Sequence, residues 1–119
     1  MRMLLSILVL SLAVIAAEVQ EPNEQFVVAK GLAVQPFATQ AQLFNPASID
    51  LDDRGRVWVA EAFNYRKKTR KAGDRILILE DSNGNGRADK TTVFYQNPDI
   101  DGVHGVCVLG DKAIVSAPD

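Results

Sequence analysis

Cysteine, histidine and tryptophan are each limited to one residue in this chain of 119 residues. A single cysteine, Cys107, excludes an internal disulfide and leaves the thiol without a disulfide partner in the chain. Cys107 falls in the apolar run Val106–Val108, and this setting predicts a buried, unreactive thiol.

A strong excess of charge is also missing. The chain carries 13 basic and 15 acidic side chains, for a formal net charge of -2 at pH 7. Loss of residues 1–17 would remove only Arg2 and change the net charge to -3. So small a charge indicates neither a nucleic-acid partner nor an anionic membrane surface.

Helical periodicity of useful length is absent after residue 17, which predicts an all-β protein with antiparallel hairpins. Short β-prone pieces at 26–29 and 32–37 are interrupted by Gly31 and Pro36. Three alternating patterns separated by Asp/Asn/Gly turns predict hairpins at 47–61, 75–96 and 105–117. Within the first, Trp58 and its neighbours Val57 and Val59 point to opposite faces, so this strand is expected to pack on both sides.

The first 17 residues have the form of a signal peptide. Arg2 precedes an apolar run at 4–15, and the small residues Ala16 and Ala17 come before Glu18. This order predicts export to the periplasm or beyond, with cleavage after Ala17 or, as the near alternative, after Ala16. The apolar run is shorter than the roughly 20 residues of a spanning helix, which favours a cleaved signal peptide. The alternative is a retained signal anchor, which would be the chain's only link to a membrane. Residues 18–25 are predicted to be a flexible leader.

An oxygen-rich turn follows the apolar stretch Arg75–Leu79. Its acids and amides occupy positions 1, 3, 5 and 9 of a calcium-loop pattern, with Gly86 at position 6 and the carbonyl of Arg87 at position 7. The predicted ligands are Asp81, Asn83, Asn85, Arg87 and Asp89. Thr92 replaces the usual glutamate at position 12, so the loop is not an EF-hand.

The same turn has a simpler interpretation as a hairpin loop without metal. Asn and Gly tolerate positive φ, and Asx side chains bond to their own backbone. Both interpretations stay open from sequence, and a bound calcium ion would have a structural role.

Two further clusters of charged residues stand out. Arg66, Lys67, Lys68, Arg70 and Lys71 could attract an anion or an acidic surface, although a solvated loop also explains them. The crowded acids Asp50, Asp52 and Asp53 lie in a hairpin turn and are expected to be solvated.

The pattern of strand, Asp/Gly turn, basic residue and strand recurs after roughly 56 positions, in the range typical of β-propeller blades. We expect residues 26–119 to form the first blade and the start of the second, in a propeller that continues beyond this sequence. One blade alone would bury too little apolar surface to fold stably.

Three motifs in order, at Asn45–Glu61, Gly73–Asp81 and Asn83–Lys90 followed by Val93-Phe94, resemble the N-terminal part of planctomycete-type membrane-bound dehydrogenases. The propeller of that family is similar to that of soluble glucose and sorbosone dehydrogenases. The resemblance implies an exported oxidoreductase acting on a sugar or another small molecule, with pyrroloquinoline quinone or haem c as electron carrier. The chain lacks the Cys-x-x-Cys-His segment that attaches haem c.

No catalytic or cofactor-binding residue is predicted from these residues. His104 precedes an expected inner strand, where loops line the mouth of a propeller, but it does not match a catalytic histidine motif. Fold alone does not determine function, so the alternative is a non-catalytic secreted propeller that binds carbohydrate or protein.

Overall fold

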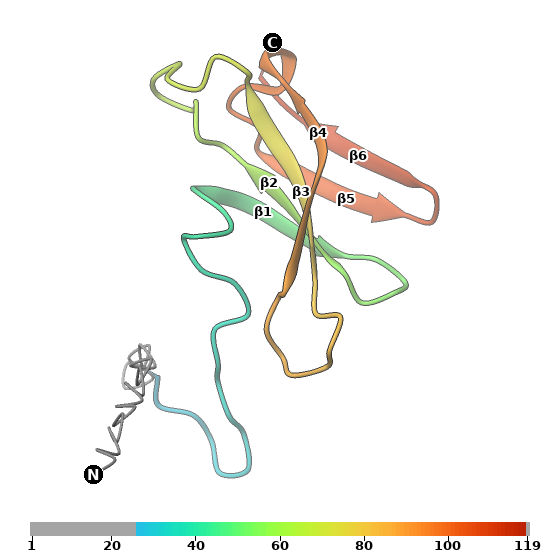
Figure 1. Ribbon diagram of the computed structural model, residues 1–119. Coiled ribbons are helices and arrows are strands. Elements are labelled where there is room, and N and C mark those ends of the chain that lie inside the picture. The colour runs from blue at the N-terminus through green and yellow to red at the C-terminus, as the bar shows by residue number, and fades with distance from the viewer. Residues whose placement is uncertain (1–25, 119) are drawn as a thin grey trace, which may run out of the picture. The chain divides into compact units, whose positions relative to one another are not determined.

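The computed structural model describes residues 26–118 and contains antiparallel strands without an α-helix in that range (Figure 1). The elements are β1 (Pro46–Leu51), β2 (Val57–Glu61), β3 (Asp74–Glu80), β4 (Lys90–Asn97), the 3-10 helix η2 (Pro98–Ile100), β5 (Gly105–Leu109) and β6 (Lys112–Ser116). The all-β prediction and the three predicted hairpins are confirmed. The predicted signal peptide and leader, residues 1–25, lie outside the described residues.

The chain divides into two compact units at Val34, and residues 26–34 belong to the first. These residues form a turn in which the Leu32 N–H donates to the Ala29 carbonyl at 3.1 Å, with Gly31 at a φ of +89°. The β-prone pieces at 26–29 and 32–37 do not form strands. No described strand pairs with either piece, and an extended segment without a partner does not become a strand.

The second unit contains a four-stranded sheet in the order β1-β2-β3-β4, in which each strand is antiparallel to the next. The strands therefore follow the chain as a meander without crossovers. A bulge between Ile76 and Leu77 shifts the pairing of β3 with β4. In the first hairpin, Gly55 adopts a φ of +74°, which a residue without Cβ reaches at little cost.

Asp52 organises the turn between β1 and β2. Its Oδ1 accepts the N–H groups of Arg54 and Arg56, each at 3.0 Å, and its Oδ2 accepts the Trp58 indole N–H at 3.0 Å. Burial acts to raise the pKa of Asp52, but the Trp58, Arg56 and Arg54 hydrogen bonds together hold it well below its usual range. The expectation that Asp52 is solvated is wrong, because only 3% of its side chain is exposed.

The central strands β2 and β3 are buried on both faces, as the sequence predicts for Trp58. Trp58 is 6% exposed and packs on one face with Ala60, Ile76 and Ile78. The opposite face buries Val59, Leu77 and Leu79 under Phe37, Ala38 and Leu43 of the segment before β1. The first sheet is thus the middle layer of the second unit.

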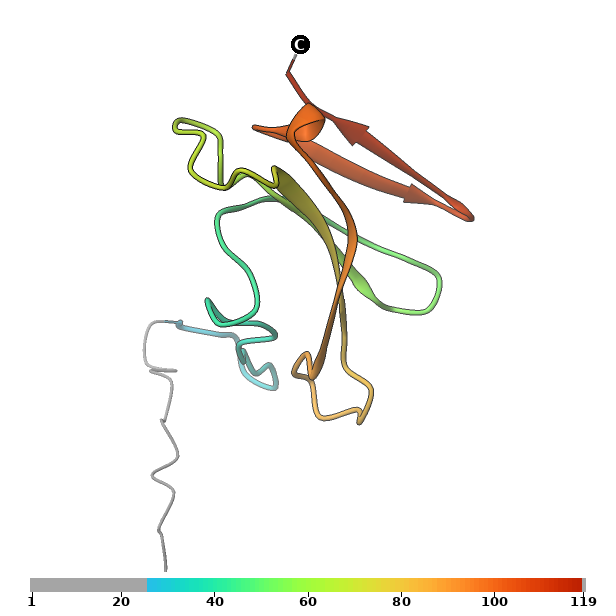
Figure 2. The same ribbon diagram turned by 45° about the horizontal axis from the view of Figure 1, so that its top comes forward.

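The two-stranded sheet β5-β6 covers the Trp58 face, with Val106 in the shared core and Val108, Ala113 and Val115 packed against it. Figures 1 and 2 show the β5-β6 hairpin beside β1 and β2. Two side chains of β1 join the sheets: the Ser48 Oγ accepts the Val106 N–H at 3.3 Å, and the Asp50 Oδ2 accepts the Val108 N–H at 2.6 Å. The Val108 N–H is the main reason that the pKa of Asp50 is lowered.

Cys107 points away from this core. It pairs with Ile114 across the β5-β6 hairpin, and both side chains are exposed, as is Leu109. The prediction of a buried thiol is wrong, because Val106 and Val108 take the inward positions and strand alternation turns Cys107 outward. Within residues 26–118, no helix has the length and apolar character to cross a membrane.

Candidate functional site

The predicted metal ligands lie in one loop, residues 81–89, which joins β3 to β4. Asp81 is its centre: Oδ1 accepts the N–H groups of Gly84 at 2.8 Å and Asn85 at 3.2 Å, and Oδ2 accepts the Gly86 N–H at 2.8 Å. Gly84 and Gly86 adopt φ values of +75° and +82°, which turn their N–H groups inward at little steric cost. One carboxylate thus holds three successive backbone donors.

Asp89 closes the loop from its other end. Its Oδ1 accepts the Ser82 N–H at 3.0 Å, and its Oδ2 accepts the Ser82 hydroxyl at 2.8 Å and the Asn83 amide at 2.7 Å. The Ser82 N–H is the main cause that lowers the pKa of Asp89. The two amides make Asx turns, because Asn83 Oδ1 accepts the Asn85 N–H at 3.1 Å and Asn85 Oδ1 accepts the Arg87 N–H at 2.9 Å.

All five predicted ligand residues therefore belong to one hydrogen-bonded turn. Its acceptors are all oxygen, the ligand type that calcium prefers. Each carboxylate already accepts three hydrogen bonds, which leaves about one of its four lone-pair positions for a cation. Residues 26–118 contain no group of three or more His, Cys, Asp or Glu side chains that could hold a metal. The loop is satisfied without an ion, and it has oxygen positions to spare for one.

The segment before β1 fastens this loop to the sheet. The Ala88 N–H donates to the Phe37 carbonyl at 2.8 Å, and the Gln42 side chain donates to the Ala88 carbonyl at 2.7 Å. Because Phe37 also covers Leu77 and Leu79, loop 81–89 is coupled to the apolar core. An ordered loop 81–89 therefore helps to hold Phe37 over the core, whether or not a metal is present.

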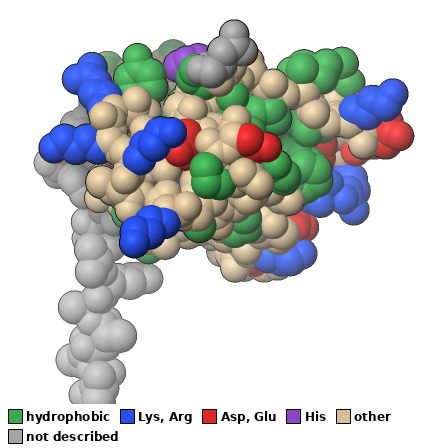
Figure 3. Space-filling view, turned by 90° about the horizontal axis from the view of Figure 1, so that it is seen from above, with side chains coloured by type: hydrophobic (Ala, Val, Ile, Leu, Met, Phe, Trp, Pro, Cys, Tyr) green, Lys and Arg blue, Asp and Glu red, His purple; other side chains and the backbone are tan. Residues whose placement is uncertain are grey.

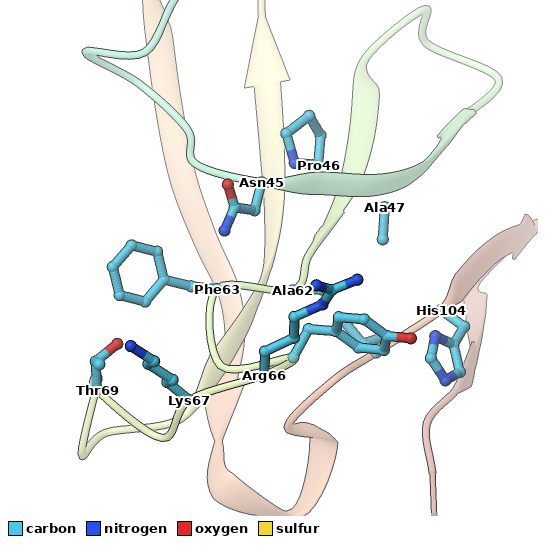
Figure 4. Close-up of a pocket in the computed structure, with 11 residues that line it drawn as sticks. Asn45, Pro46, Ala47, Ala62, Phe63, Arg66, Lys67, Thr69 and His104 are labelled. Atoms are coloured by element: carbon cyan, nitrogen blue, oxygen red, sulfur yellow. The ribbon is translucent and has the colours of Figure 1, made fainter.

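A groove of about 610 Å³ lies at the opposite end of β3, where β1 and β5 begin. Figure 4 shows its lining drawn from three parts of the chain. These parts are the start of β1 (Asn45, Pro46, Ala47), loop 62–73 (Ala62, Phe63, Tyr65, Arg66, Lys67, Thr69) and the residues before β5 (Val103, His104). Most of the wall is apolar, and no acidic residue lines it.

Loop 62–73 forms the largest part of this groove and is held by a buried asparagine. Asn64 is 4% exposed; its Oδ1 accepts the N–H groups of Thr69 and Arg70, and its amide donates to the Arg70 carbonyl and to Asp101. Asp74, fully buried, accepts the N–H groups of Asn64 and Gly102, both at 2.8 Å. The basic residues of this loop are therefore carried on a fixed backbone.

A buried ion-pair cluster supports the same loop. Glu61, at the end of β2, is fully buried and accepts Arg70 on Oε1 and Arg75 on Oε2, each at 2.6 Å. The Arg70 guanidinium lies 4.4 Å from the centre of the Phe63 ring, within the range of a cation–π contact. Through Arg70, Glu61 sets the position of one aromatic wall of the groove.

His104 and the front of the loop meet in the groove. The Tyr65 and His104 rings lie edge to face with centroids 5.8 Å apart, and the Arg66 guanidinium is 5.9 Å from the Tyr65 ring centre. In Figure 4, Arg66 lies between Phe63 and His104. Figure 3, seen from this end, shows Lys and Arg side chains on both the left and the right of the molecule, with the histidine at the upper margin. The structure thus brings together the basic loop and His104, which sequence patterns treat separately.

Sequence patterns missed the buried groups that build the groove, above all Glu61, Asn64 and Asp74. A signal for them exists in Ala60–Asn64 and in Asp74, where a polar residue interrupts or adjoins an apolar, strand-like run. Polar side chains in such positions are either solvated or fully hydrogen-bonded, and local sequence does not distinguish the two.

The second unit is accordingly an all-β arrangement of two antiparallel sheets with a small-molecule-sized groove at one end. The chain belongs to the family described as "Domain of unknown function (DUF7133)", which matches residues 18–119. No curated protein matches the chain. No solved structure matches it.

Proposed function

We propose that residues 26–119 form the first blade and the start of the second blade of an exported β-propeller. The observation that carries this proposal is the four-stranded meander followed directly by a hairpin that packs on its face. Successive blades of a propeller are four-stranded antiparallel sheets that pack face to face around a channel. In this arrangement β1 and β5 are the innermost strands of their blades.

The two outward faces support the presence of neighbouring sheets. On β1, Ile49 and Leu51 are 66% and 61% exposed, although they pair with the buried or half-buried Val59 and Val57. On the second sheet, Leu109 and Ile114 are each 57% exposed. Exposed apolar side chains on both outer faces are expected where further blades pack.

The single cysteine tests this arrangement in the full-length exported protein. If the next sheet covers β5-β6, Cys107 will react slowly with a thiol reagent in the native state and rapidly in denaturant. The measurement is the ratio of the two labelling rates, with a free thiol peptide as the reference. Native labelling as fast as that of the peptide would contradict a covering blade.

For activity, we propose an oxidoreductase that acts on a sugar or another small molecule, as the family resemblance implies. Two features of the groove support this: it lies where β1 and β5 begin, and its volume is within the roughly 300–1,000 Å³ of small-molecule sites. Haem c does not fit these residues, because Cys107 is the only thiol. Pyrroloquinoline quinone would sit over the channel among several blades, so no residue of this chain is assigned to it.

A non-catalytic propeller that binds carbohydrate or protein is the second candidate. It is favoured by the absence of any carboxylate among the groove residues, because His104 then has no partner there to make it a general base. Reduction of an artificial electron acceptor by the full-length protein, with quinone, calcium and a panel of sugars, separates the two. Sugar-dependent reduction supports the oxidoreductase; sugar binding without reduction supports the binding propeller.

We also propose that loop 81–89 binds calcium in a structural role. The oxygen-only acceptor set of Asp81, Asn83, Asn85 and Asp89 supports this, since these oxygens are already ordered by the loop. The ion would neutralise two carboxylates that otherwise lie in the same turn. Thermal unfolding with calcium and with chelator tests this proposal directly.

A further inference from the structure

The groove beside His104 is a concave site in which cations lie without an acidic residue in the lining. The ion pairs within residues 26–118 join acids to Arg56, Arg70, Arg75 and Lys90. None of these ion pairs involves Arg66 or Lys67. Both of these side chains line the groove, and the lining includes no Asp or Glu. Uncompensated positive charge in a cleft attracts an anion more strongly than the same charge on a convex surface.

The groove also presents an apolar and aromatic wall. Pro46, Ala47 and Phe63 supply the apolar surface, and Tyr65 adds a ring beside the Arg66 guanidinium. This combination suits a ligand that has a non-polar ring face next to an anionic group. A simple inorganic anion would use the cation and leave the apolar wall in contact with water.

Two neutral polar side chains complete the lining. Asn45 supplies an amide and Thr69 a hydroxyl, both of which can donate to and accept from ligand hydroxyl groups. Asn45 adopts a φ of +46°, the only non-glycine residue among 26–118 at positive φ, and its carbonyl accepts the Ala62 N–H at 3.0 Å. That bond ties the β1 wall to the loop wall, so the two sides of the groove keep their spacing.

The loop wall is prepared before any ligand arrives. Asn64 accepts the backbone N–H groups of Thr69 and Arg70, and Glu61 pairs with the Arg70 side chain, so the loop is tied on both sides of Arg66 and binding orders few additional groups. A preformed site loses less conformational entropy on binding than a mobile loop. A fixed backbone of this kind distinguishes a binding site from a mobile basic loop on the surface.

We propose that this groove binds a carboxylated sugar of the uronate type. The Arg66 guanidinium binds the carboxylate, the Tyr65 and Phe63 walls contact the ring, and Asn45 and Thr69 bond to ring hydroxyls. This proposal can be tested separately from the proposed oxidation, because ligand binding is measured without electron transfer.

The test is calorimetric titration of the full-length exported protein with glucuronate. Two matched ligands accompany it: glucose, which keeps the ring and lacks the charge, and acetate, which keeps the carboxylate and lacks the ring. Glucuronate is expected to bind more tightly than glucose or acetate, and its affinity is expected to fall as the salt concentration rises. Equal binding of glucose would remove the role of the cations, and equal binding of acetate would reduce the site to a bare anion site; either result overturns the proposal, as does no binding of glucuronate.

Two variants assign the charge to one residue. Arg66→Gln should weaken glucuronate binding roughly tenfold or more, because it removes a charge-assisted hydrogen bond. Lys68→Gln removes the same charge from the same loop, but Lys68 does not line the groove, so a change below about twofold is expected. Both residues are exposed, and unchanged unfolding midpoints will show that the variants are folded. Equal losses in the two variants would mean diffuse attraction to the loop and would overturn the site.

Discussion

Loop 62–73 and loop 81–89 lie at opposite ends of β3, and both are rich in charged and polar residues. In loop 81–89 the charged groups are used internally: Asp81 and Asp89 accept six hydrogen bonds from their own turn. In loop 62–73 the internal bonds are made by Asn64, which leaves Arg66 and Lys67 free of ion pairs within residues 26–118. The comparison teaches that internal bonding limits what a loop offers a ligand: the acids of loop 81–89 keep about one lone-pair position each for a cation. In loop 62–73, Asn64 bonds to the backbone and leaves the two cations to a ligand.

The largest expected effect comes from removing the buried carboxylate beneath loop 62–73. Glu61→Ala leaves Arg70 and Arg75 without their partner, and breaking a buried pair in this way costs about 3–5 kcal/mol. Glu80→Ala is the matched control, because Glu80 pairs with the largely exposed Lys90 and should cost less than about 1 kcal/mol. Urea unfolding of the full-length protein measures both.

Equal losses in the Glu61 and Glu80 variants would contradict the idea that loop 62–73 is held from inside. The comparison between the loops would then rest on Asn64 alone.

A smaller effect is expected when calcium is added and removed. If loop 81–89 binds the ion, calcium should raise the melting temperature by stabilising the fold by about 1–3 kcal/mol near saturation, and chelator should reverse this. Asp81→Ala should melt lower even in chelator, since it breaks three backbone hydrogen bonds, and it should lose the response to calcium. The measurement is thermal unfolding with and without calcium.

An unchanged wild-type melting temperature in calcium and chelator would reject the metal and leave the hydrogen-bonded turn. A calcium response that persists in Asp81→Ala would place the ion elsewhere in the protein.

The smallest effect concerns a third turn, between β1 and β2, where Asp52 is bonded like Asp81 but is nearly buried. The folded state lowers the pKa of Asp52 below its ordinary value of 3.8. Its stabilising contribution is therefore complete above that value and is lost as the pH falls toward the lower folded pKa. Asp52→Asn should flatten the decline in stability below pH 3.8, as measured by urea unfolding across the acid range. An unchanged slope would show that the Asp52 bonds do not form in solution.

Residues close in sequence decided the features that local patterns predict correctly. Strand alternation in 47–61 and 75–79 placed Trp58 and Val59 on opposite buried faces, because side chains alternate along any strand. The Asx and glycine positions of 81–89 likewise brought the five predicted ligand residues into one turn, since those bonds span at most seven residues.

Only the tertiary structure decided which polar groups are buried and which apolar ones are exposed. Alternation places Cys107 on the face opposite to Val106 and Val108, but it does not say which face is buried. The packing of β5 against the first sheet buries the valine face and exposes Cys107. The groove arises because Asn64 bonds to Asp101, 37 residues away, and Tyr65 meets His104, 39 positions along the chain. Contacts over such separations depend on how the sheets stack, and alternation of polar and apolar residues carries no information about that stacking.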